Sequence, residues 1–459
     1  MSTAPGSGVP ELAGLARYPE AARIGYSVDE TVRRLLRYQW VERWLMRDAL
    51  SHLASEPVWE VKGGYALHQW LDGQHADGLR KRIGEMRHPI PPLDRTPDSA
   101  LERLLDEALR STDAVELLAG SYAVIREGLA ESYRDHLARS NPLVDQPTRR
   151  VVQAALTDHE EALAWGRTAL GVLTRDPAAA GRATEWQRHL RAYLEAAGGI
   201  AGPAPPGEAS LPDSRVRGPF VPDFHPRRDA RFTGQHDFAF PPHVLYNDPR
   251  VPADERNLAL LAKRTLEMDV PEMMASILVE RPEQPWEFQL DFSRQLWDEM
   301  RHAMMGSVAF EARGVDWTRI PLNLGFSLRL NLHATPLERQ QLLFAIEQSL
   351  MPGETGKRFE YQTAVDAGDP VSVHFHDFDW ADEVLHAHIG RRWLRHEGIT
   401  PDQAIANAPD IHERTWAALD RYRTTPLPGD WWGDFVQSVL GKPSALQPRE
   451  RGDLKILAE

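Results

Sequence analysis

The sequence predicts an all-α protein. Three long segments repeat apolar residues at spacings of three and four, which is the period of a helix with one buried face: TVRRLLRYQWVERWLMRDALSHLA, ALERLLDEALRSTDAVELLAGSYAVIREGLAESYRDHLA and NLALLAKRTLEMDVPEMMASILVE. Runs that alternate apolar and polar residues, as half-buried strands do, are scarce. With 459 residues, the chain is long enough to form two or three separate cores.

A Pro- and Gly-rich segment interrupts this helical pattern at 197–252. Such a composition cannot sustain helices or central strands. The segment is nevertheless rich in aromatic residues, which disordered linkers lack, so we expect it to pack against the domains. These aromatic residues are Phe220, Phe224, Phe232, Phe238, Phe240 and Tyr246. We therefore expect a helical domain at 1–196, an ordered connection at 197–252 and a second helical domain at 253–459.

Composition and charge exclude several classes of function. No apolar run approaches the ~20 residues that span a bilayer, so we expect no membrane insertion. The net charge of −14 repels phosphate backbones and argues against a nucleic-acid partner. The absence of cysteine excludes disulfides, thiolate nucleophiles and cysteine-ligated clusters, so any metal must bind His and carboxylates. The N-terminus MSTAPGSGVPELAGLARYPE lacks the features of a secretory or transit peptide, and we expect a cytoplasmic protein.

The second half of the chain contains the ligand pattern of a carboxylate-bridged metal pair. In a four-helix bundle such a site takes one Glu from each of two helices and a Glu-x-x-His pair from each of the other two. The strings WDEMRHAMMG and ADEVLHAHIG each contain that pair, whose members share one helix face. A lone Glu lies upstream of each pair, in RTLEMDV and FAIEQSL. The predicted ligands are Glu267, Glu299, His302, Glu347, Glu383 and His386.

Antiparallel geometry supports this pairing, because ligands that face each other across a helix hairpin lie at similar distances from its turn. The midpoint between each lone Glu and its pair falls at 283 in RPEQPW and at 365 in YQTAVDAGDP, and both strings contain helix breakers. Glu272 is an alternative to Glu267. We prefer Glu267, because the repeat between the two halves aligns it with Glu347.

Further polar residues near the pairs are candidate partners of the ligands. Asp298 and Asp382 directly precede the two paired glutamates, and we expect them to accept the free N–H of a metal-bound imidazole across the bundle. His376 and Asp379 precede Glu383 by seven and four residues, close to the same helix face. We expect them to act as additional ligands or as hydrogen-bond partners of the ligands, with the second role preferred.

These residues resemble the ferritin-like superfamily of diiron carboxylate proteins over about 254–397, and DEVLHAHIGRRWL is particularly similar to an uncharacterised bacterial ferritin-like family. The resemblance implies a ferritin-like four-helix bundle with two iron ions. The ligand set also suits Mn/Fe and Mn/Mn pairs. Within this superfamily the reactions differ widely, so the resemblance implies no particular substrate.

The first half contains a degenerate version of the same plan. The string LHQWLDGQHADG places Asp72 and His75 at the spacing of a ligand pair, and Glu42 lies upstream. A second hairpin would run from Glu131 to TDHEEALAWG. Aligning Gly166 with Gly390 puts His159 in place of Glu383 and Ala162 in place of His386. We expect that only the C-terminal copy binds a metal pair; an unrelated helical domain is the alternative.

Three functions remain open from the sequence. The first is a non-heme diiron oxidase or oxygenase that uses O2 and an external electron donor to oxidise a small organic substrate. The second is a metal-binding protein that oxidises or stores iron. The third is a helical interaction protein without metal. The added N-terminal half favours the first, and a homodimer is left open.

Overall fold

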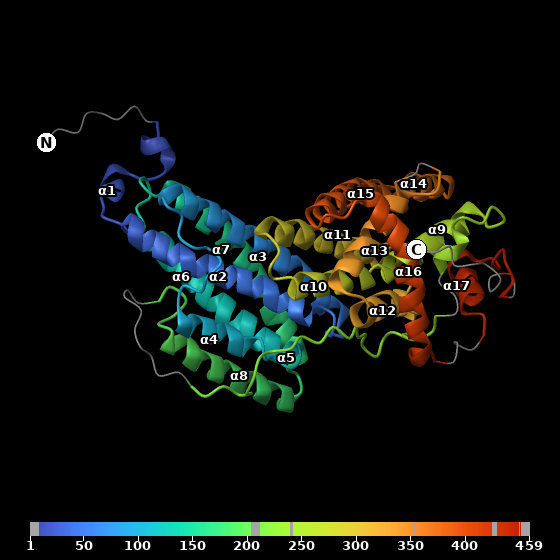
Figure 1. Cartoon of the computed structure of the whole chain (residues 1–459), viewed down its shortest axis with the longest axis horizontal. Helices are drawn as coiled ribbons and strands as arrows, with labels where there is room; N and C mark the ends of the chain where they lie inside the picture. Colours follow the sequence, from blue (N-terminus) through green and yellow to red (C-terminus); the bar gives the residue numbers. More distant parts are fainter. Residues whose placement is uncertain are drawn as a thin grey trace. The chain divides into compact units, whose positions relative to one another are not determined.

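The computed structural model describes residues 9–202, 212–238, 242–351, 354–424, 429–448 and 450. Helices and loops make up these residues, and none of them lies in a strand, so the predicted all-α class is confirmed (Figure 1). Across the described ranges, no helix is both long and apolar enough to cross a bilayer. The chain divides into two compact units: unit 1 contains residues 1–49 and 68–221, and unit 2 contains residues 50–67 and 222–459.

Unit 1 is built from the first eight α-helices and a π-helix. The bounds are α1 Tyr18–Ala21, α2 Val28–Leu53, α3 Trp59–Met86, α4 Ser99–Ala108, α5 Ala114–Leu117, the π-helix Leu118–Arg126, α6 Glu127–Arg139, α7 Gln146–Leu173 and α8 Pro177–Ala196. Helix α5, the π-helix and α6 follow one another without a break. Because α2 continues to Leu53 and α3 begins at Trp59, the end of α2 and the start of α3 belong to unit 2.

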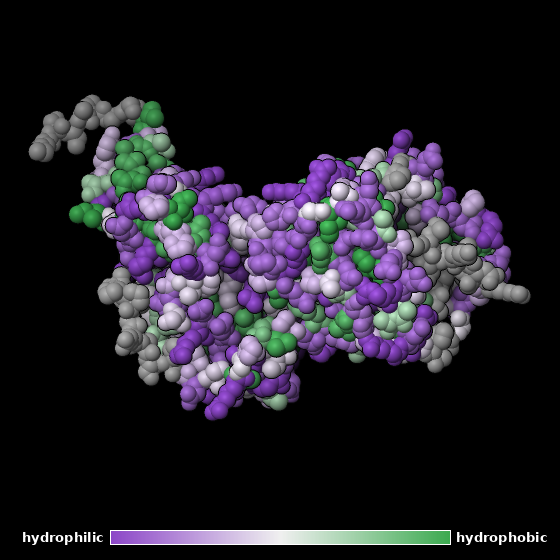
Figure 2. Space-filling view, viewed as in Figure 1, coloured by the Kyte–Doolittle hydropathy of each residue, from purple (hydrophilic) through white to green (hydrophobic). Residues whose placement is uncertain are grey.

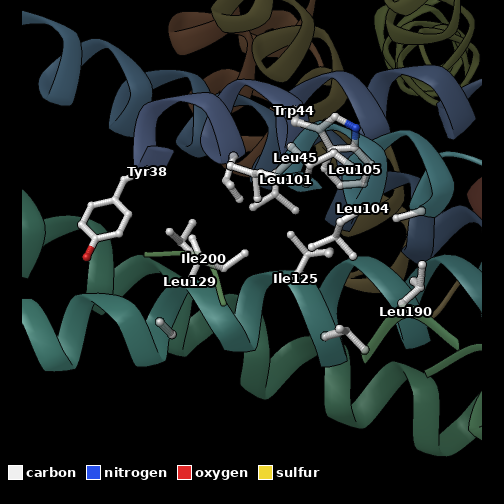
Figure 3. Close-up of a cluster of buried hydrophobic side chains, with 14 of the residues drawn as sticks. Tyr38, Trp44, Leu45, Leu101, Leu104, Leu105, Ile125, Leu129, Leu190 and Ile200 are labelled. Atoms are coloured by element: carbon white, nitrogen blue, oxygen red, sulfur yellow. The ribbon is translucent and has the colours of Figure 1, made fainter. Parts of the chain in front are cut away.

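The core of unit 1 is apolar and is supplied by most of its helices. Trp44 and Leu45 of α2 face Leu101 of α4, while Ile125 and Leu190 come from the π-helix and α8 (Figure 3). All of these side chains are at most 7% exposed. Burial of this kind contributes about 25 cal/mol per Å² of apolar surface and holds the surrounding helices in place.

Unit 2 contains the helices that carry the predicted ligands. Their bounds are α9 Ala253–Leu266, α10 Asp269–Glu280, α11 Trp286–Glu311, α12 Gly325–His333, α13 Pro336–Ser349, α14 Lys357–Asp366, α15 Pro370–His396, α16 Pro401–Ala417 and α17 Trp431–Leu440. Helix α11 packs against both α9 and α15, and α15 packs against α13. Two of these helices begin at a side-chain cap. Thr335 and Glu338 form a capping box before α13, and the Asp369 side chain caps the N-terminus of α15.

Glycines at corresponding places allow the ligand helices to approach closely. A Cβ on Gly306 would lie 2.9 Å from the backbone nitrogen of Thr265 on α9. A Cβ on Gly390 would lie 2.8 Å from the ring of Phe344 on α13. Both glycines come one helical turn after the His of their pair, so they bring that His close to the neighbouring helix.

The two hairpins that the sequence indicates are interrupted. The first turn does fall where expected, between Glu280 and Trp286, but the preceding helix is broken at Glu267 into α9 and α10. In the second half, Glu347 lies on α13, which ends at Ser349, and the separate helix α14 comes before the turn at 367–369. The ligand helices therefore still pack side by side, although neither lone Glu lies on one continuous helix leading to its turn.

In the described parts of the connecting segment, 197–202, 212–238 and 242–252, several aromatic side chains are buried. Phe224, Phe232 and Phe238 are at most 9% exposed, whereas Phe240 lies outside the described residues. The segment is shared between the units, because unit 2 begins again at residue 222. These boundaries differ from the expected division at 196 and 252. Near the start of the described chain Ile24 is fully exposed, and Figure 2 shows a green patch at that end.

Candidate metal centre

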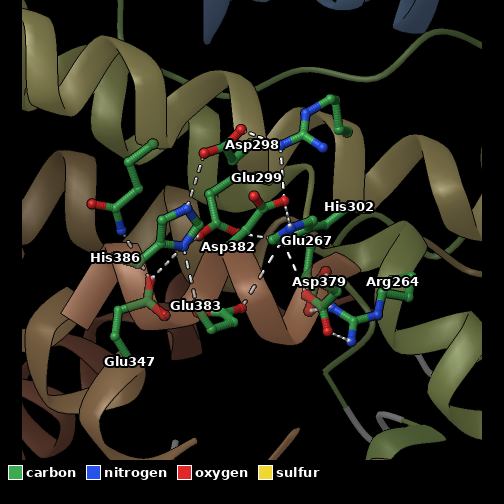
Figure 4. Close-up of polar contacts among 12 residues, drawn as sticks. Arg264, Glu267, Asp298, Glu299, His302, Glu347, Asp379, Asp382, Glu383 and His386 are labelled. Carbon is green, nitrogen blue, oxygen red and sulfur yellow. Dashed lines mark hydrogen bonds and ion pairs between the residues drawn. The ribbon is translucent and has the colours of Figure 1, made fainter. Parts of the chain in front are cut away.

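Four buried ligand groups from three helices meet inside unit 2. They are Glu299 of α11, Glu347 of α13, and Glu383 and His386 of α15, and one ligand atom of each lies within 4.8 Å of the others (Figure 4). His386 Nδ1 is 3.1 Å from Glu299 Oε1 and 3.4 Å from Glu383 Oε2. All four side chains are at most 4% exposed. This group could hold one metal ion.

His302 lies on the other side of the same two carboxylates. Its Nδ1 atom is 3.7 Å from Glu299 Oε2 and 4.0 Å from Glu383 Oε1. The centres of the His302 and His386 rings are 5.8 Å apart. Glu299 and Glu383 therefore lie between the two imidazoles. Each carboxylate has one oxygen near His302 and the other near His386, which is the arrangement that a carboxylate shared by two metal ions requires.

Each imidazole is oriented by an aspartate from the opposite helix. His386 Nε2 on α15 lies 3.5 Å from Asp298 Oδ2 on α11, and His302 Nε2 on α11 lies 3.3 Å from Asp382 Oδ2 on α15. Arg301 contacts both aspartates, at 2.8 Å from Asp382 Oδ2. Because Nε2 faces a carboxylate in both rings, Nδ1 is the atom directed at the centre (Figure 4). Asp298 and Asp382 thus occupy the places expected for partners of the imidazoles.

Three buried atoms at this centre make no hydrogen bond: His302 Nδ1, His386 Nδ1 and Glu383 Oε2. Unpartnered buried polar atoms are rare in folded proteins and call for an explanation. These three are the atoms through which metal ions are coordinated. With the four carboxylates Glu267, Glu299, Glu347 and Glu383 nearby, the donors fit two divalent ions, whose charge would balance the carboxylates.

The pKa values show how much negative charge is crowded here. Burial, then the neighbouring carboxylates of Glu383 and Glu299, raises the pKa of Glu347 well above its usual range. Burial disfavours the charged form of His302, but Asp379, Asp382 and Glu299 overcome it and raise the pKa to about 10. Without a metal ion the cluster therefore retains protons that a metal pair would displace.

Glu267 lines the same cavity as the other ligands but points to a cation of the chain. It caps the C-terminal end of α9, and both of its oxygens accept bonds from Arg264 NH1, at 3.0 and 2.9 Å. Lys357, the first residue of α14, is completely buried, and its Nζ lies 2.8 Å from Glu383 Oε1. A metal ion on the His302 side would share Glu383 Oε1 with this ammonium group, so it can bind fully only if Lys357 withdraws.

Asp379 and His376 belong to a network beside the His302 side. Asp379 contacts both Arg264 and Lys357, and its Oδ1 lies 3.3 Å from His302 Nδ1. Glu360 accepts from Arg264 NH2 at 2.7 Å and lies 3.7 Å from His376 Nδ1. Burial, with help from the Arg264 charge, lowers the pKa of His376 to about 3, so the ring is neutral. Glu360, His376 and Asp379 could also hold a cation, but Arg264 already fills that role.

Glu272, the alternative to Glu267, points elsewhere. It is fully buried and pairs with Lys62 and Arg228, while Ser327 Oγ donates to its Oε2 at 2.8 Å. Its carboxylate charge is thus neutralised by residues that have no contact with the two histidines. Of the two alternatives, only Glu267 lines the cavity at the centre.

A cavity of about 230 Å³ opens onto the carboxylates. Glu267, Glu299, Glu347 and Glu383 all line it. The remaining wall is mainly apolar and includes Leu266, Val270, Phe326, Leu343, Ile346, Leu350 and Trp416. The segment IPLNLGFSLRLNLHATP at 320–336 contributes Asn323, Gly325, Phe326 and Arg329 to this wall.

Sequence reasoning missed four residues of this centre: Arg264, Gln295, Lys357 and Glu360. Gln295 donates to Glu347 Oε1 at 3.0 Å. It precedes Glu299 by four residues, and Arg264 precedes Glu267 by three, so helical spacing alone could have marked both. Lys357 and Glu360 lie on α14, a helix that the sequence analysis did not separate.

The ligand candidates of unit 1 are only partly brought together. Glu42, Asp72, His75 and His159 form a buried group in which one ligand atom of each lies within 4.8 Å of the others. Glu131 is exposed.

A comparison of the chain with protein-family models, curated proteins and solved structures finds no match.

Proposed function

We propose that unit 2 is a ferritin-like four-helix bundle whose two metal ions, as an iron pair, use O2 to oxidise a small organic substrate. The observation that carries this proposal is the convergence of His302 Nδ1, His386 Nδ1 and Glu383 Oε2, all buried and all without a hydrogen bond. The opposite nitrogen of each imidazole faces an aspartate. Both rings are therefore held in the orientation that metal coordination needs before any metal arrives.

A bound iron pair would supply the activation of O2, which no side chain of the chain can perform. Glu299 and Glu383 would hold both ions, because each directs one oxygen toward His302 and the other toward His386. Glu347 would complete the His386 side, and Glu267 the His302 side after rotating away from Arg264. Asp298 and Asp382 fix the imidazoles and so keep the donor atoms in place.

The cavity indicates the chemical class of the substrate. Its wall is mainly apolar apart from the carboxylates and a few other polar side chains, so a small and largely apolar molecule would bury its surface against residues such as Ile346 and Leu350. A filled cavity would also keep water away from the reacting end. The sequence carries no flavin or nicotinamide fingerprint, so electrons would come from an external donor.

Metal analysis of the purified chain tests the first part of this proposal. Protein treated with a chelator and then loaded anaerobically with Fe²⁺ should retain at least about two iron ions per chain after gel filtration. Glu299→Ala should lose most of them, because this residue faces both imidazoles. Glu287→Ala removes an exposed Glu at the start of the same helix and should bind as the wild type does. Less than about one iron per wild-type chain would overturn the proposal.

Oxygen consumption tests the second part. The ferrous protein, supplied with a reductant, should consume O2 faster when a small apolar substrate is present, and the product should contain a new oxygen atom or double bond. The Glu299→Ala variant should abolish this uptake, and Glu287→Ala should not. Uptake that is independent of organic substrates and yields only ferric mineral would instead identify an iron-oxidising or storage protein.

A further inference from the structure

Unit 1 contains a second buried cluster of imidazoles and carboxylates. Glu42 comes from α2, Asp72 and His75 from α3, and His159 from α7, and one ligand atom of each lies within 4.8 Å of the others. Glu42, Asp72 and His159 are fully buried, and His75 is 7% exposed. The cluster thus combines two carboxylates with two imidazoles in a site that water scarcely reaches.

The orientation of His75 leaves one ring nitrogen directed into this cluster. His75 Nε2 lies 2.9 Å from Asp158 Oδ2, so this nitrogen donates its hydrogen to the half-exposed carboxylate. His75 Nδ1 then faces Glu42 Oε2 at 3.5 Å, and neither atom makes a hydrogen bond. Two facing lone pairs repel each other unless a cation or a proton lies between them.

The same arrangement orients His302 in unit 2. There, Asp382 directly precedes Glu383 and faces His302 Nε2 at 3.3 Å. Asp158 directly precedes His159, which the internal repeat aligns with Glu383. The aspartate at the same place in the repeat therefore holds the corresponding imidazole in both units. Asp72, His75 and His159 of the unit 1 cluster thus stand at the repeat positions of Glu299, His302 and Glu383.

The counterpart of the His386 side is filled by the chain itself. Ala162 stands where His386 is expected, and Glu131 is exposed. Instead, Arg126 donates to Asp72 through both NH1 and NH2, at 2.6 and 2.8 Å, and its NH1 also bonds His159 Nδ1 at 2.8 Å. Arg126 ends the π-helix Leu118–Arg126, a type of helix that occurs often at functional sites. The guanidinium of Arg126 thus supplies a positive charge at the place that corresponds to the metal ion proposed for the His386 side of unit 2.

From this geometry we infer that unit 1 binds a single divalent transition-metal ion through Glu42, Asp72, His75 and His159. Two imidazoles and two carboxylates suit Zn²⁺, Mn²⁺, Fe²⁺ or Co²⁺. His159 Nε2, which donates to Glu42 Oε1 at 2.8 Å, would become a ligand by moving its proton to Nδ1. The bond from Arg126 NH1 to Nδ1 would then break, while Arg126 kept its two bonds to Asp72. This inference does not depend on the function of unit 2.

Cobalt binding by the full chain tests the inference. Chelator-treated protein is loaded with Co²⁺, passed through a desalting column and analysed for metal. His75→Ala should lose about one Co²⁺ per chain relative to the wild type, whereas His88→Ala, an exposed histidine of unit 1, should lose none. The loss should add to that caused by His386→Ala in unit 2. Equal cobalt contents of the wild type and His75→Ala would overturn the inference.

A second measurement covers the case in which His75→Ala does not fold. Anomalous diffraction from cobalt-soaked crystals of the wild type should show a peak between Glu42 Oε2 and His75 Nδ1. Asp158→Asn, which changes only the partner of His75, should weaken Co²⁺ binding at this position about 10–100-fold, while Glu161→Gln on the same helix should not. A wild-type crystal with cobalt in unit 2 and no peak here would refute the site and leave the proposed function of unit 2 intact.

Discussion

Replacing Lys357 with Met tests how far the chain itself neutralises the metal centre. The buried ammonium group lies 3.0 Å from Asp379 Oδ1 and 2.8 Å from Glu383 Oε1. Methionine is similar in length but uncharged, so both carboxylates would lose a cation in a buried site. Removing one partner of a buried ion pair costs about 3–5 kcal/mol. For a unit of this size, that loss should lower the melting temperature of the metal-free protein by about 6–20 °C.

The same substitution should strengthen metal binding on the His302 side. Glu383 Oε1 would no longer be shared with an ammonium group, so a second Mn²⁺ ion should bind at least about tenfold more tightly, which corresponds to about 1.4 kcal/mol. Thermal unfolding with chelator and with excess Mn²⁺, together with titration calorimetry, measures both effects. Excess Mn²⁺ should restore most of the lost stability. Lys81→Met, which removes a lysine whose side chain is 73% exposed, should change neither quantity.

An equal loss of stability in chelator and in excess Mn²⁺ would refute this reasoning. It would mean that Lys357 and the metal ion do not compete for Glu383. A variant as stable as the wild type without metal would show that the two carboxylates are neutralised by other means, for example by protons.

Three further predictions concern the neighbouring residues. Asp382→Asn should weaken metal binding about 10–100-fold in titrations, because an uncharged amide accepts more weakly from His302 than a carboxylate does. Asp377→Asn on the exposed face of the same helix should have no effect. Gly306→Ala should destabilise unit 2 by about 1–3 kcal/mol in urea unfolding, since its Cβ would meet the backbone of α9; Gly171→Ala, with open space around it, should not destabilise the protein. As the pH falls from about 6.5 to 3, His376 takes up a proton in the unfolded state but not in the folded state, where its pKa is about 3. The free energy of unfolding should therefore drop by up to about 4 kcal/mol over this range. His376→Leu should flatten that part of the stability curve, and parallel curves for variant and wild type would contradict the assignment.

The pairs Glu299 with His302 and Glu383 with His386 could be found from the sequence because their spacing is local. Residues three apart share a helix face whatever the rest of the fold does. Glu347 was found by comparing the two halves of the C-terminal domain. Their similarity is visible in the sequence, although α13, the helix that carries Glu347, ends at Ser349. The all-α class followed from the same periodicity and is confirmed.

Lys357 could not be found in this way. It is the first residue of α14, and nothing in the string GETGKRFE distinguishes a buried lysine from the exposed ones that are the rule. Its position depends on how α14 packs against α15 and α9, which is a tertiary property. The unit boundaries were missed for a related reason: the boundaries at 49/50 and 67/68 fall inside α2 and α3, where the helical pattern of the sequence is unbroken.

The crossed aspartates of the metal centre make the two ligand pairs dependent on each other. Asp298 on α11 serves His386 on α15, and Asp382 on α15 serves His302 on α11. If α11 slid along α15 by one helical turn, about 5.4 Å, both imidazoles would lose their partners in the same step. The alignment of these two helices and the readiness of both histidines to bind metal are therefore a single property, and neither motif can lose its aspartate without disabling the histidine of the other.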